Sequence, residues 1–262
     1  MPFDKLVFDF APWSMSKAKL ALQCPFAFNL KYVQHISEKK ADKSSANRIG
    51  VAVHEVLEDV IKGMPIKSAY QKGMAKHQLT SVEMDESLAM MHNVQTFMER
   101  LAVFKRERDV TEQHVEKKFG LDKDLHPVAF FGNTVFFRGV WDLCLRAQSK
   151  YLIIIDHKTG QAKIDISQYE DQLRMYAIAG VRVFEGIEGV QAALNYIQGD
   201  TGMVWDKMHK PEQIQTEFIE WFEGFLNNAA TCATRTHAHP GYWCSYCAYV
   251  SACPIKATAT EK

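Results

Sequence analysis

The order of apolar and polar residues predicts helices in the first and last parts of this chain. Apolar side chains recur at helical spacing up to Ile61, and Gly63 follows, so a helix is predicted over about residues 46–61. Further helices are predicted over residues 14–23, 82–108, 168–179 and 211–228.

The middle of the chain changes to the two-residue period of strands. β-branched and aromatic residues predict strands over residues 111–119, 134–145, 151–155 and 190–197. Leu152 to Ile155 form a continuous apolar run, as expected for a strand that is covered on both faces. The pattern as a whole predicts an α/β protein.

Composition narrows the class of protein. With 262 residues, of which 47% are hydrophobic, the chain can bury a full core as one large domain or as a compact pair. The first residues lack the basic start and apolar run of a signal peptide, and no stretch reaches the ~18 apolar residues that a membrane span needs. We therefore expect a cytoplasmic protein with no membrane segment. No G-x4-G-K-[ST] loop is present, so nothing indicates ATP hydrolysis by this chain.

The formal net charge is zero, so any contact with nucleic acid must come from local basic patches. Short basic runs are more often solvated surface than binding sites. The two candidate runs contain Lys39, Lys40 and Lys43, and Lys105, Arg106 and Arg108.

Four of the six cysteines form the most informative pattern in the sequence. Cys24 lies between two predicted helices near the start, and Cys244, Cys247 and Cys253 form a C-x2-C-x5-C run near the end. In a reducing compartment such cysteines are metal ligands or catalytic groups more often than disulfides. Together they can bind one soft metal centre and tie the two ends of the chain together.

Either zinc or an iron-sulfur cluster can be held by four thiolates, and structural zinc is the commoner occupant. Zinc ribbons, however, use two C-x2-C knuckles within one short segment, whereas Cys24 stands alone far upstream. The remaining cysteines, Cys144 and Cys232, are expected to be small buried residues.

Asp156-His157-Lys158 directly follows the apolar run and carries the candidate chemistry. Side chains alternate along a strand, so Asp156 and Lys158 are expected on one face and His157 on the other. A hairpin would bring Asp142 beside Asp156, and two such carboxylates make a hard oxygen site for Mg2+ or Mn2+. A lysine there can activate a water and stabilise charge on a phosphate. The triplet alone is common by chance; its placement after a buried strand favours a site.

Two pairs of residues at helical spacing add further candidates. Gly50 lies one turn before His54, so no side chain obstructs the close approach of another element or a ligand there. Gln172 and Tyr176 are also four apart and share a helix face. Taken alone, each pair is more often ordinary packing or surface.

The ordered motifs together resemble a known family. Gly50-x3-His54, Gly139-x2-Asp142, Asp156-x-Lys158 and Gln172-x3-Tyr176 resemble the RecB-type nucleases of the PD-(D/E)xK superfamily. The cysteine pattern resembles the iron-sulfur branch, which includes the nuclease domain of AddB and the CRISPR-adaptation exonucleases. The resemblance spans about residues 14–254.

This resemblance implies a fold and a domain organisation. The fold would be a restriction-endonuclease-like core, with a central mixed sheet flanked by helices. One nuclease domain would span residues 1–262. Its parts would be a helical N-terminal part at 14–110, the nuclease core at 111–200, and a C-terminal helix with the cysteine cluster at 201–262.

The resemblance also implies roles for the motif residues. His54, Asp142 and Asp156 would bind Mg2+ or Mn2+ with help from the backbone carbonyl of His157, and Glu116 is a further acidic candidate.

The other motif residues would position the water, contact the DNA or bind the metal cluster. Lys158 would activate or position the attacking water, and Gln172 with Tyr176 would contact DNA or support Lys158. Cys24, Cys244, Cys247 and Cys253 would hold a 4Fe-4S cluster, with structural Zn2+ as the alternative.

The function implied is a metal-dependent DNA exonuclease that acts on single-stranded ends. Tyr32, Trp141, Trp243 and Tyr246 are available to stack on unpaired bases or to pack around the cysteines. The chain lacks the helicase portion of many relatives, so it would act alone or with helicase, recombination or adaptation partners. The alternatives are a non-catalytic DNA-binding adaptor and an end-trimming subunit of a CRISPR-adaptation complex.

Overall fold

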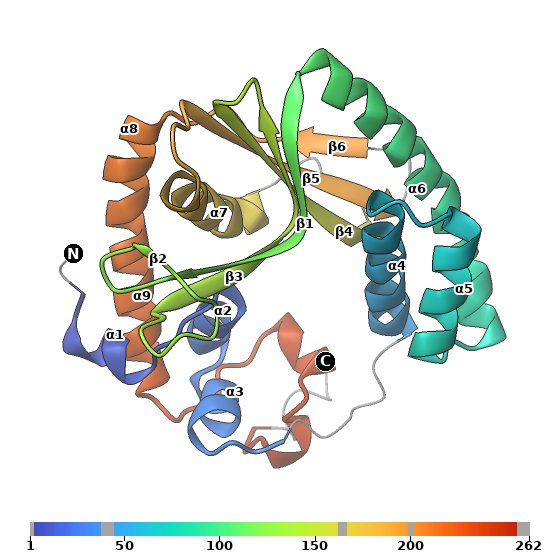
Figure 1. Ribbon diagram of the computed structural model, residues 1–262. Coiled ribbons are helices and arrows are strands. Elements are labelled where there is room, and N and C mark those ends of the chain that lie inside the picture. Colours follow the sequence, from blue (N-terminus) through green and yellow to red (C-terminus); the bar gives the residue numbers. More distant parts are fainter. Residues whose placement is uncertain (1–2, 38–44, 162–166, 199–201, 256–262) are drawn as a thin grey trace. The chain divides into compact units, whose positions relative to one another are not determined.

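The computed structural model describes residues 3–37, 45–161, 167–198 and 202–255 (Figure 1). The basic run at Lys39, Lys40 and Lys43 lies outside these residues. The chain divides into two compact units, each assembled from separate segments. We call them the sheet unit, Lys43–Phe119 with Val140–Phe218, and the terminal unit, Met1–Asp42 with Gly120–Gly139 and Ile219–Lys262.

The strands form one mixed sheet in the order β2-β1-β3-β4-β5-β6 among the described residues. β3 pairs antiparallel with β4, β4 pairs parallel with β5, and β5 pairs antiparallel with β6. The strands are β1 (Val110–Leu121), β2 (Pro127–Val128), β3 (Phe137–Ala147), β4 (Tyr151–Gln161), β5 (Gly189–Gln198) and β6 (Gly202–Trp205). The first residues of β3 and the last of β1 belong to the terminal unit.

In the sheet unit, helices cover both faces of the sheet, as Figure 1 shows. Ile153 and Ile155 of β4 pack with α4 and α6 on one face. On the other face Gly180 of α7 approaches Leu152 closely, because a Cβ there would lie 2.6 Å from that side chain. The helical segments are α4 (Ser45–Ile61), α5 (Ile66–His77), α6 (Ser81–Glu107), η2 (Ser167–Tyr169), α7 (Glu170–Val183), α8 (Pro211–Gln213) and η3 (Ile214–Phe218).

The terminal unit has its own aromatic core. Trp13 stacks on Phe28, and Phe137 packs edge-on against Phe222, all with essentially no exposed surface. Ser14 caps the helix that follows it, since its side chain accepts the backbone N–H of Lys17. The helical segments are α1 (Lys5–Asp9), α2 (Met15–Gln23), α3 (Pro25–Phe28), η1 (Asn29–Val33), α9 (Ile219–Ala233), η4 (Tyr242–Tyr246) and η5 (Val250–Ala252).

The predicted α/β class, with a mixed sheet flanked by helices, is confirmed. One prediction about the candidate site is wrong in detail: the strand does not stop at Ile155, because β4 continues to Gln161. Its pairing with β5 extends past Lys158, so Asp156 and Lys158 lie inside a strand rather than at its end. Within the described ranges, no helix is both long and apolar enough to cross a bilayer.

Candidate active site

The β3–β4 hairpin places two carboxylates opposite one another, as the sequence predicted. The antiparallel register pairs Leu143 with Ile155, so the next position on each strand is Asp142 and Asp156. In keeping with this register, the charge of Asp142 contributes to the raised pKa of Asp156. One short turn between two strands therefore creates the acidic centre of the site.

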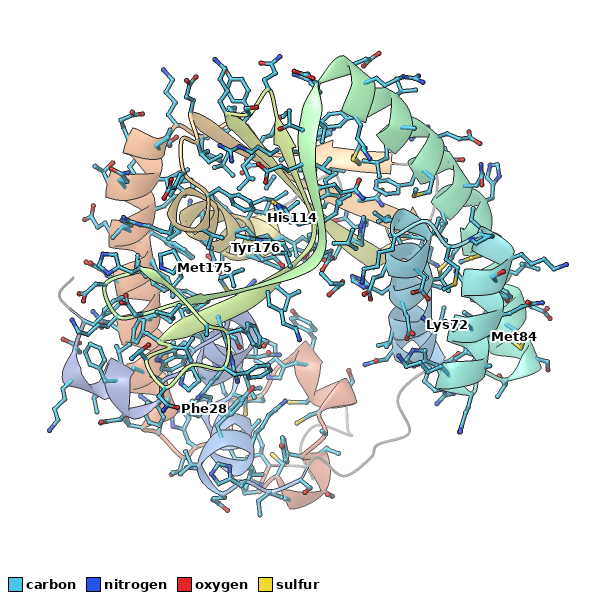
Figure 2. All side chains as sticks on the ribbon, viewed as in Figure 1. Phe28, Lys72, Met84, His114, Met175 and Tyr176 are labelled. Atoms are coloured by element: carbon cyan, nitrogen blue, oxygen red, sulfur yellow. The ribbon has the colours of Figure 1, made fainter. Side chains whose placement is uncertain are left out.

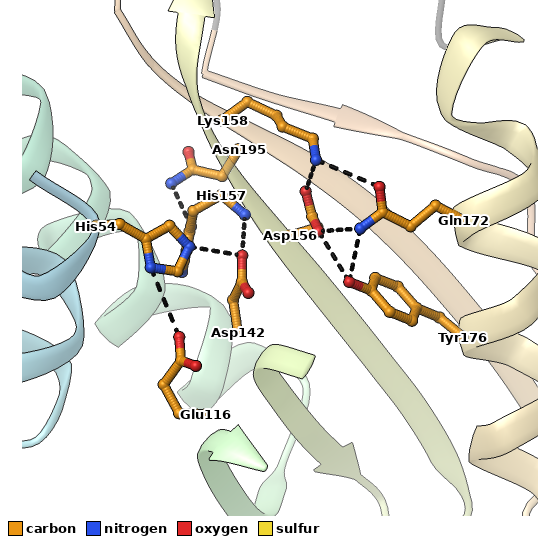
Figure 3. A network of polar contacts seen from close by, with 9 residues as sticks. All are labelled: His54, Glu116, Asp142, Asp156, His157, Lys158, Gln172, Tyr176 and Asn195. Carbon is orange, nitrogen blue, oxygen red and sulfur yellow. Dashed lines mark hydrogen bonds and ion pairs between the residues drawn. The ribbon is translucent and has the colours of Figure 1, made fainter. Parts of the chain in front are cut away.

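Asp156 lies in a dense hydrogen-bond network on the α7 side of the sheet (Figure 3). Lys158 Nζ lies 2.5 Å from Asp156 Oδ2, so the two side chains share a face as predicted. Gln172 Nε2 donates to Asp156 Oδ1 at 2.8 Å and to Tyr176 Oη at 2.7 Å. Tyr176 donates to the same Asp156 oxygen at 3.0 Å. The predicted helix-face pair thus holds the carboxylate from one side.

The lysine is oriented by two more contacts. Its Nζ donates to Gln172 Oε1 at 3.4 Å and lies 4.5 Å from the ring centroid of Tyr169. Gln172 therefore contacts Lys158 and Asp156 at once, an arrangement that fixes the position of both charged groups.

His54, Glu116 and Asp142 form a second group beside this network (Figure 3). His54 Nε2 lies 3.0 Å from Asp142 Oδ2, and His54 Nδ1 lies 3.6 Å from Glu116 Oε1. One ligand atom from each residue lies within 4.8 Å of the others. An imidazole nitrogen with two carboxylate oxygens is a donor set that suits Mn2+ and Mg2+.

Glu116 reaches this group through an unusual backbone conformation. Its φ angle is +52°, in the left-handed region that non-glycine residues seldom adopt. Such a conformation persists only where the surrounding structure enforces it, and it is concentrated at functional sites.

The charges of the site push the pKa values of its carboxyl groups apart. Burial and the neighbouring charge of Asp142 raise the pKa of Asp156, whose exposed fraction is only 3%. Burial opposes ionisation of Asp142 as well, but the hydrogen bond and charge of His54 hold the pKa of that carboxyl below its usual value. Burial also lowers the pKa of His54, yet Asp142 and Glu116 outweigh it and raise that pKa to about 9.

His157 points to the opposite face of the sheet, as strand alternation predicted. Burial lowers the pKa of its side chain to about 3, so the ring is neutral. Asn195 of β5 lies 3.0 Å from His157 Nδ1, and Phe97 packs edge-on against the ring. The backbone N–H of His157 donates to Asp142 Oδ2 at 2.7 Å, so this buried residue helps to position a candidate ligand.

Asn195 was not predicted from the sequence. The signal in the sequence is the amide of Asn195 between apolar residues of β5. A polar side chain buried at such a position needs a hydrogen-bond partner.

Helix α4 approaches β4 closely where His54 enters the site. A Cβ on Gly50 would lie 2.7 Å from Thr159 Oγ1 of β4. The sequence interpretation of Gly50, that it leaves room for another element one turn before His54, is confirmed.

A groove opens beside His54, Glu116 and Asp142. It has a volume of about 1130 Å3, and His54, Glu116 and Thr159 lie along it. Lysines of α5 also line it; one of them, Lys72 (Figure 2), donates to Asp59 Oδ2 at 2.7 Å. The groove is large enough to receive a polymer strand.

The four motif cysteines gather around one cavity of the terminal unit. Cys24, Cys244, Cys247 and Cys253 line it together with apolar residues that include Tyr249. Burial raises the pKa of the Cys247 thiol, and the charges of the other three cysteines raise it further, so each of the three acts on Cys247. Four sulfur donors around one small cavity fit a soft metal centre.

The two leftover cysteines differ. Cys144 is fully buried in β3, and burial raises its pKa, so the prediction of a small core residue is confirmed. For Cys232 the prediction of a buried residue is wrong. This cysteine is half-buried, because it lies outside the buried face of α9 to which its neighbour Ala233 belongs.

The prediction that Trp141 is available to stack on bases is wrong. Trp141 has no exposed surface and packs between Phe119 and Phe184, because it sits on a covered face of β3. Trp243 lines the cysteine cavity. The side chain of Tyr246 lies outside the described part of the structure.

A protein-family model matches nearly the whole chain, including the site described above. The model of the PD-(D/E)XK nuclease superfamily matches residues 12–254, which include every site residue named above. The chain belongs to the PD-(D/E)XK nuclease superfamily. The mixed sheet flanked by helices is consistent with that fold, and the histidine–carboxylate group fits the divalent metals that PD-(D/E)XK nucleases use.

A curated relative of this PD-(D/E)XK chain is a subunit of an ATP-dependent helicase/deoxyribonuclease from Clostridium perfringens (strain SM101 / Type A). The two are 25% identical over 244 residues. The match covers 79% of this chain and 21% of the relative, so the chain spans about a fifth of that protein's length.

Two solved structures resemble the PD-(D/E)XK chain only distantly. The crystal structure of SSO0001 aligns with 92% of this chain and 96% of its own, at 13% identity and a TM-score of 0.36. Protein VC1899 from Vibrio cholerae aligns with 87% of this chain and 54% of its own, at 10% identity and a TM-score of 0.26.

Proposed function

We propose that this protein is a metal-dependent deoxyribonuclease that hydrolyses phosphodiester bonds, and that it acts as an exonuclease on single-stranded ends. The observation that carries the proposal is the convergence of two groups in one unit. A histidine with two carboxylates, His54, Glu116 and Asp142, lies beside a buried carboxylate with a lysine 2.5 Å away.

The residues fit a divalent cation. His54, Glu116 and Asp142 would hold it, with Asp156 and the backbone carbonyl of His157 as the further ligands expected from the sequence motifs. Mg2+ or Mn2+ bound there supplies positive charge that polarises the scissile phosphate. The nitrogen donor makes Mn2+ as suitable as Mg2+.

The chain's own side chains would position the attacking water and the charged groups around it. Lys158 Nζ orients the attacking water and stabilises negative charge that develops on the phosphate. Gln172 keeps that ammonium near Asp156, since it contacts both groups. Tyr176 is held protonated by burial, which raises its pKa well above the usual value, so it stays a hydrogen-bond donor to Asp156.

DNA is the proposed substrate for two reasons. The groove beside His54 and Glu116 is open and has room for a strand. The Clostridium perfringens relative is a helicase/deoxyribonuclease subunit, which supports DNA over RNA. By the same likeness we propose that this chain works with a helicase or with recombination or adaptation partners.

The test is cleavage of end-labelled single-stranded DNA by wild type and by Lys158→Ala, with Mg2+, with Mn2+ or with chelator. We expect chelator to abolish cleavage and the variant to lose about 10^2- to 10^3-fold in rate, the usual cost of removing one group that stabilises charge in the transition state. The label position gives the polarity of digestion.

Lys150→Ala is the matched control. Lys150 also lies over a tyrosine ring, 5.2 Å from the centroid of Tyr151, and also pairs with a carboxylate, that of Glu188. This control variant should cleave at the wild-type rate. Full activity of Lys158→Ala, or cleavage unaffected by chelator, would overturn the proposal.

We also propose that the four cysteines hold a 4Fe-4S cluster with a structural role. The cavity they share supplies four thiolates and an apolar surround that includes Phe26 and Tyr249. Structural zinc would use the same donors, and metal and sulfide analysis of anaerobically purified protein separates the two.

A further inference from the structure

The loop between β2 and β3 presents two adjacent aromatic side chains at its tip. Phe131 is 76% exposed, and its ring meets that of Phe130 edge-on at 4.8 Å between centroids. A single exposed aromatic needs no explanation. This one stands out through the charged groups around it.

The loop is held rigidly at its base. Phe136 donates its backbone N–H to Leu121 at 2.8 Å and accepts that of Trp13 at 2.7 Å. All three side chains are buried. Gly132 N donates to Ala129 O at 2.8 Å and closes the turn at the tip. The backbone that carries the aromatic pair is therefore held before any ligand arrives, which lowers the entropy lost on binding.

A guanidinium group lies against both rings. The Cζ atom of Arg138 is 5.2 Å from the ring centroid of Phe130 and 5.8 Å from that of Phe131. These distances are within the range of cation–π contacts. Arg138 thus places a positive charge directly beside an exposed aromatic surface.

The alternation of cations and rings continues from Arg138 into α2 and η1. Arg138 and Lys17 both lie beside Trp13, because the backbone N–H of Arg138 donates to Trp13 O at 3.0 Å and Lys17 Nζ lies 5.6 Å from the Trp13 ring centroid. Burial and, to a smaller extent, the charge of Arg138 lower the pKa of Lys17 to about 8. Lys17 Nζ lies 4.9 Å from the ring centroid of Tyr32, and Lys31 Nζ lies 5.5 Å from the same ring. We call these six residues the aromatic–basic strip: Lys17, Lys31, Tyr32, Phe130, Phe131 and Arg138.

The ammonium of Lys17 is fixed in this strip. It donates to Phe10 O at 2.6 Å and to Pro12 O at 3.3 Å. Two backbone carbonyls therefore hold a cation beside the ring of Tyr32, although the net charge of the whole chain is zero.

We infer that the aromatic–basic strip binds single-stranded DNA, with unpaired bases stacked on Phe131 and Tyr32 and phosphates at Arg138 and Lys17. Rings interleaved with basic side chains are the composition of single-strand binding surfaces, because every base has a π face and every nucleotide a phosphate. A duplex hides its base faces and cannot use the rings. The inference rests on the proposed function for its choice of DNA as the polymer.

The test measures binding apart from cleavage. Fluorescence anisotropy of labelled oligo(dT) is followed in chelator, with wild type, Phe131→Leu and Phe131→Trp. Phe131→Leu keeps an apolar side chain and loses the π face, and we expect binding about 5- to 100-fold weaker. Phe131→Trp should bind at least as tightly as wild type. Leu88→Ala, which alters an apolar side chain 56% exposed on α6, should not change binding.

Substitution of a basic residue of the strip should change the salt dependence of DNA binding. Arg138→Ala should weaken binding and lower the slope of log Kd against log salt by about 0.7, the value for one phosphate contact on a single strand. Arg138→Lys should restore the salt slope without restoring full affinity, because a lysine keeps the charge and loses the planar group. Duplex DNA of the same length should bind more weakly than oligo(dT).

Equal affinity of wild type and Phe131→Leu, or equal binding of duplex and single strand, would overturn the inference. The same holds if an acidic peptide displaces oligo(dT) as well as unlabelled oligo(dT) does, because the strip would then be a general anion surface. These results are independent of catalysis. Failure of the proposed nuclease would instead appear as absent metal-dependent cleavage while oligo(dT) binding remains.

Discussion

At the scale of single residues, Glu116 shows how the fold holds a group in a position it would otherwise avoid. Its backbone lies in the left-handed region, which costs an L-residue about 1–2 kcal/mol. Burial and the charge of Asp142 also raise the pKa of its carboxyl, so the charged form is disfavoured there. A residue retained at a strained, electrostatically unfavourable position is expected to serve function more than stability.

Glu116→Gly should separate these two effects. Glycine adopts positive φ without strain, and removing the carboxylate relieves repulsion with Asp142, so the free energy of unfolding should stay the same or rise. Metal-dependent cleavage should fall at least about 10-fold because a candidate ligand is lost. Denaturant unfolding and cleavage assays measure both. A variant that is destabilised and fully active would contradict this interpretation.

Residue pairs set by local geometry were predictable from the sequence. Strand alternation placed Asp156 and Lys158 together, and helical spacing placed Gln172 beside Tyr176. The partners of His157 were not predictable, because Asn195 reaches it only through the parallel register of β4 and β5, which pairs His157 with Asn195. Local sequence does not determine which residues meet across a crossover connection.

At the scale of elements, the packing of α4 against β4 positions His54. Gly50 permits that contact, since a methyl group there would lie 2.7 Å from Thr159 Oγ1. A helix interior normally gains about 1 kcal/mol when glycine becomes alanine. At Gly50 the clash should cancel that gain and displace the helix that carries His54.

Gly50→Ala should therefore lower the cleavage rate without the usual gain in stability. Gly224→Ala on α9 is the matched control, because a Cβ added at Gly224 would have nothing within 4 Å, and this variant should be stabilised by about 1 kcal/mol. Adding Thr159→Ala to Gly50→Ala should restore part of the activity. If Gly50→Ala is as active as wild type, close packing at this point does not position His54.

Several elements could be predicted and others could not. The long helix α6 was predicted because its apolar positions recur over many turns, and a Thr80–Glu83 capping box marks its start. Helix α5 was missed, since its few buried residues are small side chains and Met74. The extension of β4 past Ile155 was missed because polar residues replace the apolar run there, while pairing with β5 continues.

At the scale of the whole molecule, the chain contains two centres in two units. The candidate active site belongs to the sheet unit and the cysteine cavity to the terminal unit. If the cysteines have only a structural role, replacing them should destabilise the terminal unit before the sheet unit.

Cys24→Ser should remove the visible absorbance that is expected of the proposed 4Fe-4S cluster. Hydrogen exchange should become faster in residues of the terminal unit and change less in the sheet unit. Cys232→Ser, which replaces a half-buried cysteine outside the cavity, is the control and should keep the cluster. Equal acceleration in both units would show that the cysteines stabilise the whole chain, and an unchanged spectrum would exclude Cys24 as a ligand.

Because each unit is assembled from separate segments of the chain, the two units are completed at different times during synthesis. All segments of the sheet unit precede the last segment of the terminal unit, Ile219–Lys262, so the sheet unit can close before that segment has emerged. The terminal unit begins with the first residues of this chain but needs α9 and the last cysteines, so its early segments must wait. Until Cys253 emerges, the thiol of Cys24 lacks the full set of cysteines that line its cavity, so any metal that the four thiolates hold can be completed only after that point.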